Sequence, residues 1–238
     1  MMKIIFSDLD GTLLLRGEKR LNKNIKNSIY KIIESGNIFA VSSGRTYIEL
    51  KNFFKEFENE IFFICNDGSL AVFKEQTLHF APMEKDMFAN FKEYTAHGKY
   101  VTYIKSENKL TIRNTMEQYR GHVMRIDDIF DICEDIYKIS DFDRTVPCPL
   151  PVVYQNSMMN EFVAKDCDKK DAVTHIMSLL NVNKEDTFAF GDNVNDLGMF
   201  EVCGTSYAAI GAKPTIKKCA DKISRNIEID FLDIIKSS

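Results

Sequence analysis

The sequence lacks the features that mark several classes of protein. No apolar run in its 238 residues approaches the roughly 18–20 residues that are needed to cross a membrane. Acidic residues number 35 against 31 basic ones, so no basic excess points to nucleic acid. The six cysteines form no Cys-x-x-Cys pair and no zinc spacing, and the four histidines form no ligand pair in sequence. We therefore expect a cytoplasmic protein without membrane or nucleic-acid partners.

Short apolar runs alternate with helical patterns at both ends of the chain. Residues 3–7, 38–41 and 61–65 have the pattern of buried strands, and residues 24–35 and 47–57 between them have helical spacing. The alternation resumes after residue 166, with helices expected at 169–180, 196–201 and 214–220 and strands at 187–190 and 206–210. Strands that alternate with helices indicate a parallel sheet with crossover helices.

The middle of the chain has a different pattern. We predict strands at 100–104 and 109–112, paired across a turn at 106–108, and further strands at 152–154 and 161–164. Helices are expected at 83–96 and 115–132. The fold class is therefore α/β, with a core at residues 1–81 and 166–238 and an inserted second domain at residues 82–165.

The strongest chemical signal is the segment Asp8-Leu9-Asp10-Gly11-Thr12. Asp8 follows the first strand, and ligands bind beyond the carboxyl ends of the strands in open parallel sheets. The spacing of two residues sends Asp8 and Asp10 toward the same side, and Gly11 allows the backbone to turn and bring amides close to a bound group. Two neighbouring carboxylates repel each other and so require a cation or a shared proton. The alternative is a simple Asp-Gly turn after a strand.

Three further segments stand at element boundaries. Ser42 and Ser43 end the second apolar run, where a hydroxyl can donate to a phosphate oxygen or cap a helix. Asp192 and Asp196 lie in Gly191-Asp192-Asn193-Val194-Asn195-Asp196, either as oxygen ligands suited to Mg²⁺ or as an acidic helix start. Lys169 begins a helix within a charge run that is ordinarily solvated. Together, in this order, these segments favour a metal-assisted phosphoryl-transfer site.

With these four motifs the chain resembles the haloacid dehalogenase superfamily of phosphatases, and within it the Cof-type hydrolases. The resemblance covers the core at both ends of the chain, whereas the middle matches only by position. Because little sequence separates Leu15 from Ser43 and much separates Ser43 from Lys169, any inserted cap domain must lie after the second motif, which is the Cof-type arrangement. The resemblance implies a Rossmann-like core and an α/β cap domain that closes over the site about hinges near Pro82 and Asp166.

The chain also departs from the family pattern. The stretch Gly211-Ala212-Lys213-Pro214 lacks the asparagine that relatives carry after the last motif, and the inserted domain is small. These departures bear on the identity of the substrate and not on the chemistry.

The motifs and the resemblance together predict a Mg²⁺-dependent phosphatase that hydrolyses small phosphorylated metabolites, such as sugar phosphates, through an aspartyl phosphate. Asp8 would be the nucleophile and Asp10 the general acid and base. The residues expected to bind phosphate are Leu9, Gly11, Ser43, Gly44, Lys169 and Asn195. Those expected to hold Mg²⁺ are Asp8, Asp10 (through its backbone carbonyl), Asp192 and Asp196. Whether Asn195 and Asp196 contact phosphate, metal or water stays open.

Two alternative functions use similar residues. A phosphate-sensing receiver domain also combines acidic metal ligands, a serine or threonine and a lysine. It places its acceptor aspartate after a later strand, however, and the large insertion here favours an enzyme. A phosphosugar mutase would keep the fold and change the reaction, and its product would be an isomeric phosphosugar instead of free phosphate.

Overall fold

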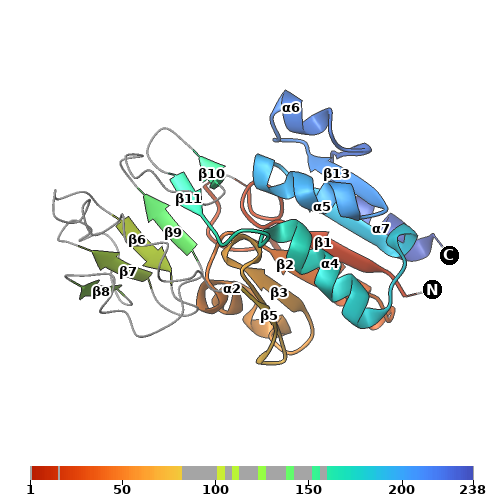
Figure 1. Ribbon diagram of the computed structural model, residues 1–238. Coiled ribbons are helices and arrows are strands. Elements are labelled where there is room, and N and C mark those ends of the chain that lie inside the picture. The colour runs from red at the N-terminus through yellow and green to blue at the C-terminus, as the bar shows by residue number, and fades with distance from the viewer. Residues whose placement is uncertain are drawn as a thin grey trace.

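A computed structural model describes residues 2–15, 17–81, 101–104, 109–112, 123–126, 138–141, 152–155 and 160–237. These residues form two β-sheets, one of eight strands and one of six, which stand side by side (Figure 1). Within the described residues, no helix has both the length and the apolar character that crossing a membrane requires.

The eight-stranded sheet is formed by strands from the amino-terminal and carboxy-terminal parts of the chain. Its strands, in chain order, are β1 (Ile4–Ser7), β2 (Ile38–Ser42), β3 (Phe62–Cys65), β4 (Leu70–Phe73), β5 (Gln76–Phe80), β12 (Thr187–Gly191), β13 (Thr205–Ala209) and β14 (Lys222–Ser224). Their spatial order is β14-β13-β12-β1-β2-β3-β4-β5. The pairs from β14 to β3 are parallel, whereas β4 and β5 continue the sheet in antiparallel fashion.

Helices cover both faces of this sheet. They are α1 (Lys23–Glu34), α2 (Tyr47–Phe53), α4 (Lys169–Leu180), α5 (Leu197–Val202), α6 (Pro214–Lys217) and α7 (Ile227–Lys236). Because successive side chains of a strand point to opposite faces, Ile5 packs in one apolar cluster and its neighbours Ile4 and Phe6 in another. The first cluster includes residues of α1, α2 and α7, and the second includes residues of α4 and α5, which lie in front of the sheet in Figure 1.

The six-stranded sheet is formed by the middle of the chain. Its strands are β6 (Val101–Ile104), β7 (Lys109–Ile112), β8 (Val123–Ile126), β9 (Lys138–Asp141), β10 (Val152–Gln155) and β11 (Asn160–Phe162), in the order β10-β11-β9-β6-β7-β8. All pairs are antiparallel except β7 with β8. The residues that precede and follow the middle of the chain lie close together, since the thiol of Cys167 lies 4.0 Å from the carbonyl oxygen of Ala81.

Most of the predicted elements of the core are confirmed. The helix at 169–180 and the parallel strands β1, β2, β3, β12 and β13 lie where the pattern placed them, and the predicted pairing of 101–104 with 109–112 is confirmed. Two predictions are wrong at their ends: the helix from residue 47 gives way to a 3₁₀ turn, η1 (Lys55–Phe57), and the helix from residue 214 ends at Lys217.

The predicted helix at 115–132 is wrong where it can be compared with the structure. Residues 123–126 form strand β8, because their backbone pairs with β7, and short apolar runs do not distinguish strand from helix. The predicted helix at 83–96, the turn at 106–108 and the expected hinge residue Pro82 lie outside the described residues. Strands β4, β5, β9 and β14 and helix α7 were not predicted.

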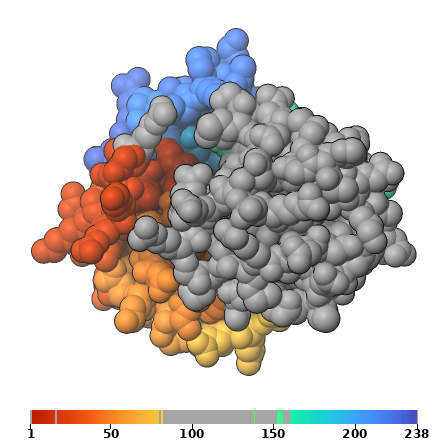
Figure 2. Space-filling model, turned by 90° about the vertical axis from the view of Figure 1, so that its left-hand side faces the viewer, coloured from red at the N-terminus to blue at the C-terminus, as the bar shows by residue number. Residues whose placement is uncertain are grey.

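The amino-terminal and carboxy-terminal parts of the chain lie next to each other around the centre of the molecule. Figure 2 shows this from the side of the six-stranded sheet, with red amino-terminal residues beside blue carboxy-terminal ones. β1 lies between β12 and β2, so the chain leaves β1 toward one side of the sheet and returns on the other. Such a reversal of strand order is the place where α/β sheets bind ligands.

A glycine sets the distance between the segment after β3 and the start of α4. Gly68 has a φ of +115°, and a Cβ atom there would lie 2.0 Å from the carbonyl oxygen of Asp168. Gly68→Ala is therefore expected to lower the free energy of unfolding by about 3 kcal/mol or more, because backbone strain adds to a backbone clash. Gly36 also has a positive φ, +76°, but a Cβ atom added there would have no neighbouring atom within 4 Å.

Gly36→Ala is the matched control and should cost about 1 kcal/mol, the cost of the left-handed conformation alone. Urea unfolding of both variants measures the difference. Equal losses of stability would contradict the close approach at Gly68.

Candidate active site

The first and last acidic motifs meet at the reversal of strand order. Asp8 follows β1 directly and Asp192 follows β12 directly, and these two strands are parallel neighbours. The amide of Asp8 donates to the carbonyl oxygen of Phe190 at 2.9 Å, which extends the pairing of the strands to the first acidic motif. Parallel pairing therefore brings together two carboxylates that are far apart in sequence.

Helix α4 carries a lysine to this point. Its N-cap residue, Asp168, accepts hydrogen bonds from the amides of Lys170 and Asp171 at 2.7 and 3.2 Å. The side chain of Asp171 accepts in turn from the amide of Asp168 at 3.1 Å, so a capping box fixes the first turn. Lys169, the first residue of the helix, is fully buried and is held at the carboxyl ends of the strands.

The Lys169 ammonium lies between two carboxylates. Its Nζ is 2.7 Å from Oδ1 of Asp8 and 2.7 Å from Oδ1 of Asp196. These two contacts raise the pKa of Lys169, although burial acts in the opposite direction, so the ammonium stays charged. The lysine therefore fixes the direction of the Asp8 carboxylate through Oδ1, and Oδ2 is the oxygen that Lys169 does not contact.

Asp196 is held from both sides. Its Oδ2 accepts from the amides of Asp192 and Asn193 at 2.9 and 3.0 Å, and its Oδ1 accepts from Lys169. Gly191 makes this approach possible, because a Cβ atom there would lie 2.4 Å from the Cβ of Asp196. Asp196 thus orders the loop after β12 as well as supplying negative charge.

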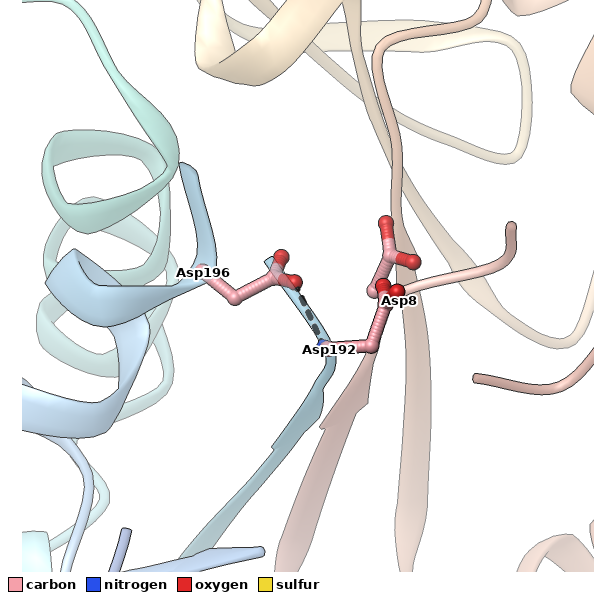
Figure 3. Close-up of side chains that lie close together, drawn as sticks. All are labelled: Asp8, Asp192 and Asp196. Atoms are coloured by element: carbon pink, nitrogen blue, oxygen red, sulfur yellow. Dashed lines mark hydrogen bonds between the residues drawn. The ribbon is translucent and has the colours of Figure 1, made fainter. Parts of the chain in front are cut away.

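The three carboxylates of Asp8, Asp192 and Asp196 face one another (Figure 3), with one oxygen of each within 4.8 Å of the others. The cluster is short of positive charge: Lys169 supplies one cation for three acids. Burial raises the pKa of Asp8 well above its ordinary value, Lys169 opposes the rise, and the charges of Asp196 and Asp192 add to it. Burial and then Asp196 raise the pKa of Asp192 to about 6.

This residue set fits a divalent cation. Carboxylate oxygens are the ligands that Mg²⁺ prefers, and the excess negative charge in a buried place is what such an ion offsets. Asp192 is the least constrained of the three carboxylates, since hydrogen bonds occupy both oxygens of Asp196 and one oxygen of Asp8. A cation would therefore be held chiefly by Asp8 and Asp192, close to Asp196.

The side chain of Asp10 turns to a different partner. Nε and Nη2 of Arg45 donate to its two carboxylate oxygens at 2.7 and 2.6 Å, and the guanidinium stacks over the ring of Phe53 at 4.6 Å. The Asp10 side chain is half-exposed, so it lies at the mouth of the site and not among the buried carboxylates. Arg45 has no predicted role, although it lies two residues after Ser43 at the same strand edge.

The remaining predicted phosphate ligands have different surroundings. Ser43 is buried after β2, and its hydroxyl oxygen accepts from the amide of Arg45 at 3.3 Å. The side chain of Leu9 is fully buried in the core, which leaves only its backbone for a ligand. The Gly11 amide donates to the carbonyl oxygen of Leu14 at 2.8 Å, and a Cβ on Gly11 would lie 2.3 Å from Oδ2 of Asp192. Gly11 therefore allows the first and last motifs to approach.

Two buried charged residues near the site were not identified from the sequence. Asp67, after β3, accepts from Nδ2 of Asn195 at 2.8 Å and pairs with Nζ of Lys138, from the six-stranded sheet, at 2.7 Å. The carbonyl oxygen of Gly44 accepts from the same Nζ at 3.0 Å. The rule that led to Asp8 could have found Asp67, since it also follows a parallel strand, but no local pattern marks Lys138.

The chain is similar to a known family and to several known proteins. The family model described as haloacid dehalogenase-like hydrolase matches residues 5–230. A 5-amino-6-(5-phospho-D-ribitylamino)uracil phosphatase of Escherichia coli is 25% identical, over 98% of this chain and 95% of its own. A phosphoglycolate phosphatase of Saccharolobus solfataricus is 24% identical, over 95% and 90%. The solved structure of a haloacid dehalogenase-like hydrolase from Bacillus subtilis covers 99% of both chains with a TM-score of 0.82 and 20% identity.

Magnesium binding at the carboxylate cluster can be tested through stability. We expect Mg²⁺ to raise the thermal unfolding midpoint of the wild type and to have little effect on Asp192→Asn, which loses a principal ligand. Without metal at pH 8, Asp192→Asn should be at least as stable as the wild type, because one repelling charge is gone. That advantage should shrink as the pH falls through about 6, where Asp192 of the wild type becomes protonated.

Glu201→Gln is the control, since Glu201 is exposed and pairs with Lys170 away from the cluster. It should keep the full effect of Mg²⁺. A wild-type midpoint that does not respond to Mg²⁺, or an equal response of Asp192→Asn, would contradict the metal site.

Proposed function

This chain belongs to the family of haloacid dehalogenase-like hydrolases, and we propose that it is a Mg²⁺-dependent phosphatase that forms an aspartyl phosphate on Asp8. The observation that carries the proposal is the buried Lys169, bonded to Asp8 and Asp196 at 2.7 Å each, beside the neighbouring carboxylate of Asp192. The family match is to hydrolases, which favours hydrolysis over the mutase and receiver alternatives.

The substrates we propose are small phosphate monoesters. The E. coli relative is named for a phosphorylated ribityl compound and the S. solfataricus relative for phosphoglycolate. These compounds share a phosphate monoester and differ in the leaving group. The shared chemistry corresponds to the core site, and the leaving group would be bound outside it.

The first step would be attack by the free oxygen of Asp8. Lys169 holds Oδ1, so Oδ2 is the oxygen that would bond to phosphorus while the bond from phosphorus to the ester oxygen breaks. The Lys169 charge, next to the nucleophile, would offset the negative charge that gathers in the transition state. Because burial and neighbouring acids favour the protonated form of Asp8, an ionised nucleophile needs further positive charge.

Asp8 and Asp192 would hold the Mg²⁺, with Asp196 and the Asp10 backbone carbonyl as further oxygen donors. When bound, the ion supplies positive charge to the transferring phosphoryl group and to the carboxylates. Asp196 would keep the loop of Asp192 in place through its bonds to the two amides.

Asp10 would move the proton. It would protonate the leaving oxygen in the first step, then take a proton from the water that attacks the aspartyl phosphate, so that inorganic phosphate leaves and Asp8 is restored. Arg45 holds Asp10 at the mouth of the site, through two hydrogen bonds, where a leaving group would enter. The hydroxyl of Ser43 and the backbone amides of Leu9 and Asp10 would hold the phosphate, whereas the Gly11 amide already donates to the carbonyl oxygen of Leu14.

We also propose that residues 82–165 act as a cap domain over this site. The six-stranded sheet stands beside the edge of the large sheet at which the parallel strands end (Figure 1). Asp166, where a hinge was expected, has a left-handed φ of 54° between β11 and α4. A cap would exclude water and contact the leaving group, which strengthens the electrostatic effects in the site.

Asp8→Asn tests the nucleophile. Phosphate release from a panel of phosphorylated metabolites with Mg²⁺ should fall about a thousandfold or more, because an amide does not attack phosphorus. The variant should remain folded by circular dichroism. Asp233→Asn, an exposed aspartate on α7, makes the same chemical change away from the site and should keep full activity. Phosphate release by Asp8→Asn at the wild-type rate would refute the assignment.

Asp10→Asn tests the general acid. With alkyl phosphates, whose leaving group needs a proton, turnover should fall about 100- to 10,000-fold. With p-nitrophenyl phosphate the leaving group departs without a proton, so an initial burst of nitrophenol should precede slow hydrolysis of the aspartyl phosphate. Equal losses with both kinds of substrate, and no burst, would argue against this role.

A further inference from the structure

A buried lysine connects the two sheets. Lys138, on β9 of the six-stranded sheet, is only 2% exposed. Its ammonium has three acceptors: Oδ2 of Asp67 at 2.7 Å, Oε2 of Glu161 at 2.9 Å and the carbonyl oxygen of Gly44 at 3.0 Å. The three N–H groups of the ammonium can each donate to one of these acceptors. A buried lysine is tolerated when its hydrogen bonds are satisfied in this way.

The partner carboxylate reaches the last catalytic motif. Asp67 is 1% exposed, and its Oδ1 accepts from Nδ2 of Asn195 at 2.8 Å. A carboxylate only accepts hydrogen bonds, so it requires Asn195 to present its NH₂ group. The amide of Asn195 is thereby fixed in one of its two orientations, with its carbonyl oxygen directed away from Asp67.

The charge of Lys138 maintains this requirement. Burial acts to raise the pKa of Asp67, and the charges of Lys138 and Lys169 outweigh it, so the pKa lies below its ordinary value. Without the lysine, the buried carboxylate would lack its ion-pair partner, and a protonated Asp67 could donate and so accept a flipped amide. The orientation of Asn195 thus depends on a residue of the other sheet.

The chain leaves little space around this pair. A Cβ atom on Gly44 would lie 2.9 Å from Oδ2 of Asp67 and 3.0 Å from Nζ of Lys138. Gly44 directly follows Ser43, so the loop after β2 touches the same pair as the loop after β12. Three segments at the strand ends therefore surround one ion pair whose cation comes from the six-stranded sheet.

We propose that Lys138 and Asp67 are positioning residues that make the orientation of Asn195, and with it the phosphate site, depend on the docking of the six-stranded sheet. This inference rests on the proposed function. When the sheet is docked, the pair holds the Asn195 amide for the phosphoryl group. When Lys138 withdraws, Asp67 loses its partner and the amide is released.

The test separates action through Asn195 from simple loss of stability. Lys138→Met and Asp67→Asn should each lower kcat/KM for p-nitrophenyl phosphate by about 10- to 100-fold, since small errors of position carry such costs. In an Asn195→Ala background the same two substitutions should lower kcat/KM by less than about twofold, because the residue through which they act is absent. Inorganic phosphate should inhibit each single variant correspondingly less.

Lys51→Met is the matched control, since it removes a partly exposed lysine of α2 that pairs with Glu75 at 2.6 Å, and it should leave kcat/KM unchanged. Thermal unfolding establishes which variants fold. If Lys138→Met does not fold, Gly44→Ala separates the pair without removing either charge, and its expected loss should again disappear in the Asn195→Ala background.

The outcomes are distinguishable. An active wild type whose Lys138→Met or Asp67→Asn variant keeps full kcat/KM overturns this inference and leaves the proposed function intact. Losses of equal size with and without Asn195 also overturn it, because they show a structural role alone. A wild type that releases no phosphate in the presence of Mg²⁺ overturns the proposed function itself.

Discussion

A shortage of positive charge governs the centre of this protein. Lys169 is fully buried and bonds to two carboxylates at 2.7 Å each, while a third carboxylate, that of Asp192, lies beside them. One ammonium cannot neutralise three neighbouring acids, and burial together with the neighbouring carboxylates raises the pKa values of Asp8 and Asp192. A divalent cation or a partly protonated cluster are the two ways to relieve it, and only the first leaves an ionised nucleophile.

The topology of the sheet creates this situation. Parallel pairing of β1 with β12 brings Asp8 next to Asp192, and a helix that starts at the strand ends brings Lys169 to Asp8 and Asp196. Glycines at 11 and 191 allow the approach, since a side chain at either position would overlap an aspartate. Gathering like charges is energetically unfavourable. The burial of the two apolar clusters, on opposite faces of the sheet, offsets this cost.

The sequence predicts the core better than it predicts the inserted region. Alternating apolar runs and the helical spacing at 169–180 are local patterns, so they predict where the strands and this helix end. Asp8, Asp192 and Lys169 stand at those ends, and the sequence therefore predicts that they share one site. The strand at 123–126 depends on pairing with β7, which no local pattern encodes. Likewise the contacts of Arg45 with Asp10 and of Lys138 with Asp67 join distant segments, and nothing within either segment indicates its partner.

The carboxylate cluster is proposed to bind a divalent cation between the first and last motifs. Anomalous diffraction from crystals soaked in Mn²⁺, which takes the same oxygen ligands as Mg²⁺, locates such an ion directly. We expect one strong peak in contact with the carboxylates of Asp8 and Asp192, next to Asp196. Absence of a peak there, or an ion bound only elsewhere on the protein, would contradict it.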